Sequence, residues 1–171
     1  MSIAKELRGI ETALNNYREQ LDIIPDELFA ETPEEGHWSF AEVYSHVMQI
    51  TLRSCIAIER CAHSNCPPTK KGLSLQGHFT LLFGCFPPVK IKMLDIMNVE
   101  KISKEDARNL IIKCRKRIED IAPIIAKAPP DVRYGHPRLG MLNARQWLRF
   151  TRIHLLRHLK QLERIKRKVM V

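Results

Sequence analysis

Four stretches of this 171-residue chain repeat apolar residues at intervals of three and four positions, the period of an amphipathic α-helix. Loops rich in proline and glycine separate the four stretches. An amphipathic helix is stable when its apolar stripe packs against a partner, so four of them in one short chain favour a helical bundle. We therefore predict a single all-α domain over residues 1–171, an antiparallel four-helix bundle.

The first two helices have recognisable ends. The spacing of its apolar residues predicts the first helix over residues 3–22, and Pro25 ends it. The second helix is expected to begin near Ser39, because Glu42 three residues later completes a capping box. This helix should stop before the proline pair at 67–68.

The third and fourth helices lie in the second half of the chain. Ser103 is a suitable N-cap for the third helix, and Pro123 should kink or end it. The fourth helix is expected to begin near Asn143, after a loop at 129–142 that is rich in proline and glycine.

A long crossover, residues 64–102, joins the second helix to the third. It contains two short apolar stretches, 78–86 and 89–97, each long enough for a short helix. Strand-like alternation does not extend over any useful length of this crossover. A connection of this length allows the two helices that it joins to be non-adjacent or parallel.

The chain carries a net charge of +9, with basic runs at 113–117 and 160–168. Such an excess favours anionic partners, either nucleic acid or an acidic small molecule. Both runs lie on predicted helices and are interrupted by core positions, and no zinc-finger, RNP-type or helix-turn-helix pattern accompanies them. The sequence therefore argues against nucleic-acid binding and favours a small anionic substrate.

Three features indicate a cytoplasmic protein without a membrane partner. No apolar run approaches the ~20 residues that cross a bilayer. The charged N-terminal segment lacks the continuous apolar stretch of a signal peptide. The cysteines are odd in number and irregularly spaced, which argues for buried thiols and against disulfides; they are Cys55, Cys61, Cys66, Cys85 and Cys114.

Three histidines fall on the apolar stripes of the second and fourth predicted helices. His154 and His158 are four residues apart and share one face of the fourth helix. His46 has helical spacing from apolar neighbours and faces inward from the second. Three buried imidazoles are unfavourable unless each finds a partner, and one shared metal ion satisfies all three. Such a set suits zinc, nickel, iron or copper and leaves coordination positions open for water or substrate.

The alternative is that these are ordinary core histidines, each with a hydrogen-bond partner in the protein. With seven histidines in the chain, a spacing of four residues can arise by chance. Arg157 is about 100° around the helix from His158, so packing or an ion pair is expected of it. Of the remaining histidines, His37 and His63 are expected at helix ends, His78 in the crossover and His136 in loop packing.

Four motifs surround the three inward-facing histidines. They are W-S-F-A-E-V-Y-S-H-V at 38–47, H-P-R-L-G at 136–140, Q-W-L-R-F at 146–150 and a closing run at 154–165. Together they resemble the DinB/YfiT-like superfamily of metal-binding four-helix bundles, whose second helix carries W-S-x-x-E-V-x-x-H-V/L. The resemblance covers essentially the whole chain.

This resemblance implies a divalent metal on His46, His154 and His158, with zinc or nickel favoured over iron or manganese. Family members of known activity are mainly transferases and isomerases that bind the thiol of a small cofactor to the metal, and many others are described as metal-dependent hydrolases. In both cases the metal lowers the pKa of a bound thiol or water and creates a nucleophile near neutral pH.

Three functions fit these features. The preferred one is a metal-dependent transferase that uses a low-molecular-weight thiol. The second is a metal-dependent hydrolase, which needs a general base that the inner stripes do not offer. The third is a non-enzymatic, stress-associated metal-binding module that assembles as a homodimer. No catalytic or cofactor-binding residue is assigned beyond the three metal ligands.

Overall fold

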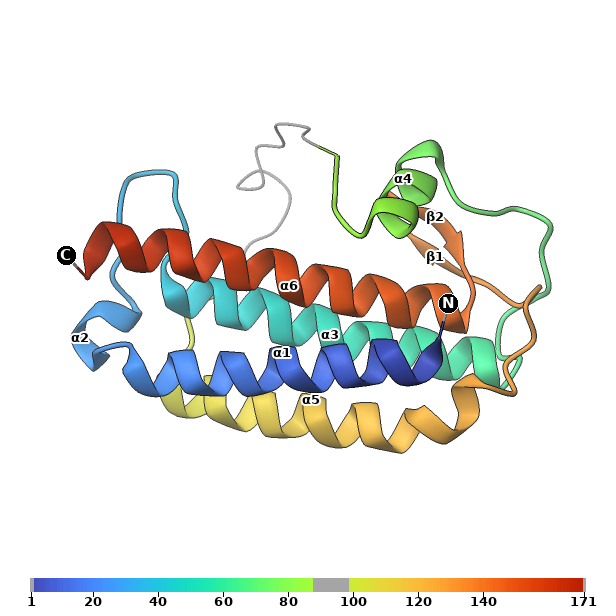
Figure 1. Ribbon diagram of the computed structural model, residues 1–171, viewed down its shortest axis with the longest axis horizontal. Coiled ribbons are helices and arrows are strands. Elements are labelled where there is room, and N and C mark those ends of the chain that lie inside the picture. Colours follow the sequence, from blue (N-terminus) through green and yellow to red (C-terminus); the bar gives the residue numbers. More distant parts are fainter. Residues whose placement is uncertain (1, 88–98, 171) are drawn as a thin grey trace.

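The computed structural model describes residues 2–87 and 99–170, and six α-helices dominate this part of the chain (Figure 1). Within it, no helix is both long and apolar enough to cross a membrane. Four long helices form a bundle, which confirms the predicted all-α fold; they are α1 (Ile3–Ile23), α3 (Phe40–Ala62), α5 (Lys104–Ile125) and α6 (Ala144–Val169). The short elements are α2 (Asp26–Phe29), α4 (Leu75–Phe83), β1 (Tyr134–His136) and β2 (Gly140–Leu142).

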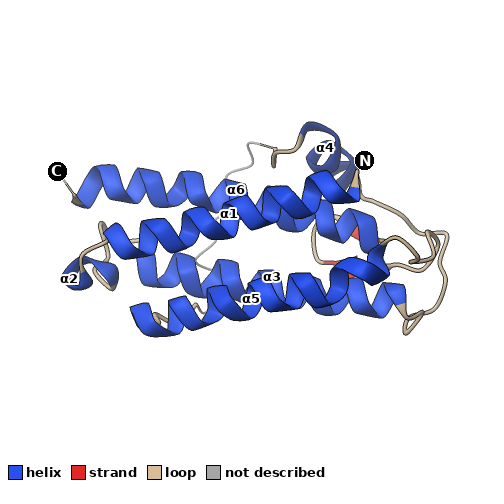
Figure 2. Cartoon of the chain, turned by 60° about the horizontal axis from the view of Figure 1, so that its bottom comes forward, coloured by secondary structure: helices blue, strands red, loops and turns tan. Residues whose placement is uncertain are grey.

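The long helices are not arranged in simple sequential order. Helix α3 packs against α5 and α6, and α1 packs against the same two helices, so α1 and α3 lie diagonally across the bundle. In Figure 1, α1 and α6 run from right to left, whereas α3 and α5 run from left to right. The α1–α5 and α3–α6 pairs are therefore antiparallel, while α3 and α5 are parallel neighbours. The long crossover between α3 and α5 permits this arrangement. Figure 2 shows α4 and the strands at the end of the bundle where α1 begins.

Capping residues set the beginning of the two helices that carry the predicted site. Ser39 Oγ accepts a hydrogen bond from the backbone N–H of Glu42, whose carboxylate accepts from the backbone N–H of Ser39 in return. Asn143 and Gln146 form the same reciprocal box at the start of α6. These four side chains satisfy N–H groups that an α-helix leaves unpaired at its first turn.

Two buried tyrosines hold α1, α3 and α6 in register. The hydroxyl of Tyr17 donates to the carbonyl oxygen of Leu155 at 2.8 Å. The hydroxyl of Tyr44 donates to the backbone carbonyl oxygen of Tyr17 at 2.7 Å. Because both side chains are fully buried, each hydroxyl needs such a partner. The two contacts fix α3 relative to α6 through α1.

The segment before α6 differs from the prediction. Residues 129–142 were expected to form a loop but contain the β1–β2 hairpin, whose three-residue strands are too short to show an alternating pattern. Helix α4 begins at Leu75, three residues before the apolar stretch at 78–86. Helix α5 continues two residues past Pro123. The helix expected at 89–97 lies outside the described residues.

The hairpin is joined to the crossover through backbone contacts at Gly140. Met141 N–H donates to the carbonyl oxygen of Gly72, and Ser74 N–H donates to that of Leu139. Gly140 has φ +86°, and a Cβ there would lie 2.6 Å from Gly72 O and from Ser74 N. Only glycine fits this position, and the contact holds the hairpin over one end of the bundle.

Candidate metal centre

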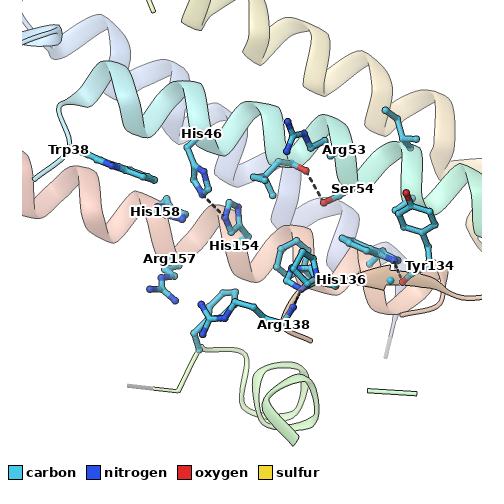
Figure 3. A pocket seen from close by; sticks show the side chains of 18 residues that line it. Trp38, His46, Arg53, Ser54, Tyr134, His136, Arg138, His154, Arg157 and His158 are labelled. Carbon is cyan, nitrogen blue, oxygen red and sulfur yellow. Dashed lines mark hydrogen bonds between the residues drawn. The ribbon is translucent and has the colours of Figure 1, made fainter. Parts of the chain in front are cut away.

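The three histidines predicted as ligands come together inside the bundle. His46 projects from the start of α3, and His154 and His158 project toward it from α6 (Figure 3). Their ring centroids are 4.5 to 5.2 Å apart, and one potential ligand atom of each lies within 4.8 Å of the other two. All three side chains are buried. The local caps and the tyrosine contacts place the triad because they fix α3 against α6.

The contact between His46 and His154 has the dimensions of a metal site. Their Nε2 atoms are 3.2 Å apart. Two imidazole nitrogens that bind one tetrahedral metal at about 2.0–2.1 Å are separated by about 3.3 Å. The two rings therefore already have the separation of two ligands of one ion.

His158 is held in the tautomer that a ligand needs. Its Nδ1 atom lies 2.7 Å from Oε1 of Gln161 in the next turn of α6. An amide oxygen only accepts, so Nδ1 carries the hydrogen and Nε2 keeps its lone pair. Metal-binding histidines usually have their second nitrogen hydrogen-bonded in this way. Gln161 was not predicted as this partner, although its position three residues along the helix was the available signal.

Each of the other two rings has one nitrogen without a partner in the described part of the protein. The Nδ1 atoms of His46 and His154 are buried and have no hydrogen-bond partner within residues 2–87 and 99–170. A buried polar atom without a partner costs free energy. If these were ordinary core histidines, each of these two Nδ1 atoms should have a partner in the protein, and the described residues provide none.

All three rings resist protonation. Burial lowers the pKa of His46 to about 4 and that of His158 to about 3, and it lowers the pKa of His154 well below the ordinary value. The nearby charge of Arg157 lowers all three pKa values further. Metals bind the unprotonated imidazole, so at neutral pH the triad is already in the form that binds a metal.

The triad opens into a pocket of about 460 Å³ (Figure 3). Trp38 packs against His46, and Phe150 packs against His154, with ring centroids 5.0 and 5.4 Å apart. Most of the remaining wall is also aromatic or aliphatic. Among the described residues, no carboxylate lines this pocket. Glu42, one turn before His46, serves in the capping box predicted for it.

Three arginines supply the charged part of the pocket wall. None of their guanidinium groups forms an ion pair with a carboxylate of the described residues. The guanidinium of Arg157 lies 4.7 Å from the centre of the Phe86 ring, so this residue packs as expected but also faces the pocket. The pocket therefore presents uncompensated positive charge, from Arg53, Arg138 and Arg157.

A fourth histidine lies in the pocket wall, where the sequence predicted only loop packing. His136 ends β1, and its Nδ1 accepts hydrogen bonds from the backbone N–H groups of Arg138 and Leu139, both at 3.1 Å. Its ring packs edge-on against Phe150, with centroids 4.6 Å apart. Burial, and to a lesser extent Arg138, lowers the pKa of His136 to about 4. The hairpin that turns this ring into the pocket had no signal in the sequence.

The other histidines and the cysteines do not line the pocket. His37 lies 3.5 Å from Glu34, His63 is the C-cap of α3, and His78 is exposed on α4. All five cysteines are free, as predicted, but only Cys55, Cys61 and Cys114 are buried; Cys66 is partly exposed and Cys85 is exposed.

Comparisons with known proteins agree with this fold. TT2238, described as a four-helix bundle protein, has a TM-score of 0.63 and 19% identity over 95% of this chain and 99% of its own. YfiT from Bacillus subtilis, described as a probable metal-dependent hydrolase with an unusual four-helix bundle topology, has a TM-score of 0.67 and 12% identity over 99% of this chain and 90% of its own. No curated protein matches the chain. A family model of the DinB superfamily matches residues 10–162, and the chain therefore belongs to the DinB superfamily.

Proposed function

We propose that the protein is a metal-dependent transferase that holds a divalent ion on His46, His154 and His158 and uses a low-molecular-weight thiol. The observation that carries this proposal is the convergence of three buried imidazoles in a pocket that has arginines in its wall. Zinc or nickel is the preferred ion, with iron or manganese as alternatives, because an all-imidazole set suits borderline transition metals best. Three protein ligands leave coordination positions for the thiol.

The ion would supply one chemical effect, a lowered pKa that keeps the coordinated thiol as a thiolate near neutral pH. The chain's own residues would do the rest. Arg138 and Arg157 attract the negative charges that small thiol cofactors and acidic acceptors carry. The apolar wall around Trp38 and Phe150 keeps water away, which strengthens these charge interactions.

Hydrolysis through a bound hydroxide is the second candidate, because the structural neighbour YfiT is described as a probable metal-dependent hydrolase. This reaction benefits from a general base beside the metal. The described part of the pocket offers no carboxylate, and the Nδ1 of His136 already accepts two hydrogen bonds. Thiol transfer needs no such base, and we therefore prefer it.

The metal part of the proposal is tested by elemental analysis of protein purified without a His-tag. We expect about one divalent ion per chain in the wild type and a large loss in the His154→Ala/His158→Ala variant. A His63→Ala variant, in which an exposed histidine outside the pocket is removed, should retain the ion. Equal metal content in all three proteins would overturn the assignment of the triad.

The reaction is tested with bacillithiol, mycothiol and glutathione, each combined with a generic electrophile. Metal-loaded protein should accelerate thioether formation with at least one thiol, and metal-free protein should not. A panel of esters and amides serves as the comparison. Metal-dependent turnover of that panel, with no acceleration for any thiol, would replace the transferase by the hydrolase.

A further inference from the structure

His136 presents a single hydrogen-bond donor to the pocket. Its Nδ1 accepts from the backbone N–H groups of Arg138 and Leu139. A backbone N–H can only donate, so Nδ1 carries a lone pair and the hydrogen of the ring sits on Nε2. Nε2 has no hydrogen-bond partner among the described residues, and it is not one of their buried unpaired atoms. Since the residue lines the pocket, this N–H is open to a ligand.

The surroundings of this N–H select the kind of atom that it can meet. Arg138 and Arg157 line the same pocket, and neither guanidinium group forms an ion pair with a carboxylate of the described residues. Two neighbouring guanidinium groups repel each other until an anion lies between or beside them. A donor N–H next to them favours a negatively charged oxygen and disfavours an ammonium group. The aromatic wall beside it, which includes Phe150, suits an apolar body attached to that oxygen.

We propose that His136 is a substrate-binding residue whose Nε2–H donates a hydrogen bond to a carboxylate oxygen, with Arg138 and Arg157 supplying the opposite charge. The substrate class is therefore a carboxylate on an apolar body. This deepens the proposed function, on which it rests for the identity of the pocket. The test below uses metal-free protein, so that a failure of metal binding does not affect its outcome.

Two substitutions separate ligand binding from a purely structural role of His136. An asparagine oxygen lies near the position of Nδ1 and accepts well from backbone N–H groups two and three residues on, so His136→Asn keeps the turn but removes the donor. A glutamine amide reaches the position of Nε2, so His136→Gln keeps a donor while it loosens the turn. If the role of His136 is purely structural, His136→Gln should be the substitution that weakens ligand binding. If its Nε2–H binds the ligand, His136→Asn should be.

The probe is phenylacetate, titrated into metal-free protein and followed by NMR. We expect the wild type to bind it and 2-phenylethylamine, a cation of similar size, not to bind. His136→Asn should weaken phenylacetate binding about tenfold or more, the effect of one hydrogen bond to a charged group, and His136→Gln should retain most of the affinity. A His63→Asn variant should bind as the wild type does.

A second readout uses the wild-type protein alone, so it does not depend on whether a variant folds. With ¹⁵N-labelled histidine, long-range ¹H–¹⁵N spectra should show His136 as the Nε2–H tautomer and should show its Nε2 signal shifting as phenylacetate is added. Failure of the wild type to bind phenylacetate would overturn the proposal. So would unchanged affinity in His136→Asn, or an Nε2 signal that does not move on binding.

Discussion

The Nδ1 atom of His158 lies 2.7 Å from Oε1 of Gln161, three residues further along α6. This contact makes Nδ1 the donor of the His158 ring and leaves the lone pair of Nε2 available. His46 and His154 have no equivalent partner at Nδ1 within the described residues. Gln161 therefore sets the orientation of one of the three imidazoles, whereas the bundle itself orients the other two.

Replacing Gln161 by leucine tests this role. The His158 ring would lose the acceptor that fixes its tautomer, and we expect metal affinity to fall about 10- to 100-fold. Gln161→Glu is the matched control, because a carboxylate keeps the acceptor and should hold the affinity at or above that of the wild type. Competition with a chelator of known affinity measures the effect. Equal affinities for Gln161→Leu and the wild type would show that the contact does not support metal binding.

Acid should destabilise the metal-free protein between pH 6.5 and about 4. Burial lowers the pKa of His46 and His136 to about 4 and that of His158 to about 3. Above pH 6.5 the rings are neutral in both states, so they add no pH dependence. Below it the unfolded chain takes up protons that the folded protein does not, and the free energy of unfolding falls by up to about 1.4 kcal/mol per pH unit for each ring.

Urea unfolding at pH 7 and pH 5 measures this loss. The midpoint should be lower at pH 5 in the wild type and in His63→Asn, which changes an exposed histidine. His158→Phe removes one of the groups and should reduce the difference between the two pH values. An undiminished difference in that variant would contradict the assignment of the effect to the buried rings.

The sequence predicted the three inward-facing histidines because their placement depends on local features. Caps such as Ser39 and Asn143 fix where α3 and α6 begin, and a helical period then decides which residues face inward. The triad needed only two such helices to face each other. For the same reason the start of α6 was predicted correctly, and so was that of α5.

The rest of the pocket could not be predicted because it depends on contacts distant in sequence. His136 faces the pocket only because backbone hydrogen bonds beside Gly140 join the hairpin to the crossover, about 70 residues earlier in the chain. Likewise, Arg157 reaches the pocket wall by packing on Phe86, which belongs to the crossover. A periodic pattern contains no information about such pairings, and three-residue strands show no period.

Arg138 and Arg157 should determine the affinity for the anionic substrate without affecting the metal. Their guanidinium groups have no carboxylate partner in the described part of the chain. We expect Arg138→Gln and Arg157→Gln each to raise KM for the active thiol about tenfold, because each removes one charge-assisted contact. Steady-state kinetics measures KM, and elemental analysis measures the metal content. Arg18→Gln, on the exposed side of α1, should change neither, and a loss of metal in Arg157→Gln would contradict the prediction.

Removing the metal should lower the melting temperature but leave the helices formed. Most of the core, including Tyr17 and Tyr44, is held by packing that does not involve the triad. A ligand at 100 times its Kd stabilises the folded state by about 2.7 kcal/mol, which for a chain of this length is a shift of about 5–10 °C. Circular dichroism with and without EDTA measures it. The His154→Ala/His158→Ala variant should not respond to EDTA, whereas complete unfolding of the wild type would favour the structural-metal alternative.

A buried carboxylate on α1 should be the most sensitive charged position outside the pocket. Glu6 is 1% exposed, and it accepts from Nη1 of Arg149 at 2.9 Å and from Nε of Arg152. Arg149 also donates to the carbonyl oxygen of Leu81, so this cluster joins α1, α4 and α6. Glu6→Gln would leave two guanidinium groups without a counter-charge.

We expect Glu6→Gln to destabilise the fold by at least about 2 kcal/mol. Fully buried pairs lose about 3–5 kcal/mol when one partner is removed, and the loss here is smaller because both arginines retain some contact with water. Urea unfolding measures the change. Asp22→Asn is the control, since Asp22 forms an exposed ion pair with Arg108 at 3.0 Å and such pairs contribute little. Equal midpoints for the two variants would show that Glu6 does not connect the three helices as its contacts indicate.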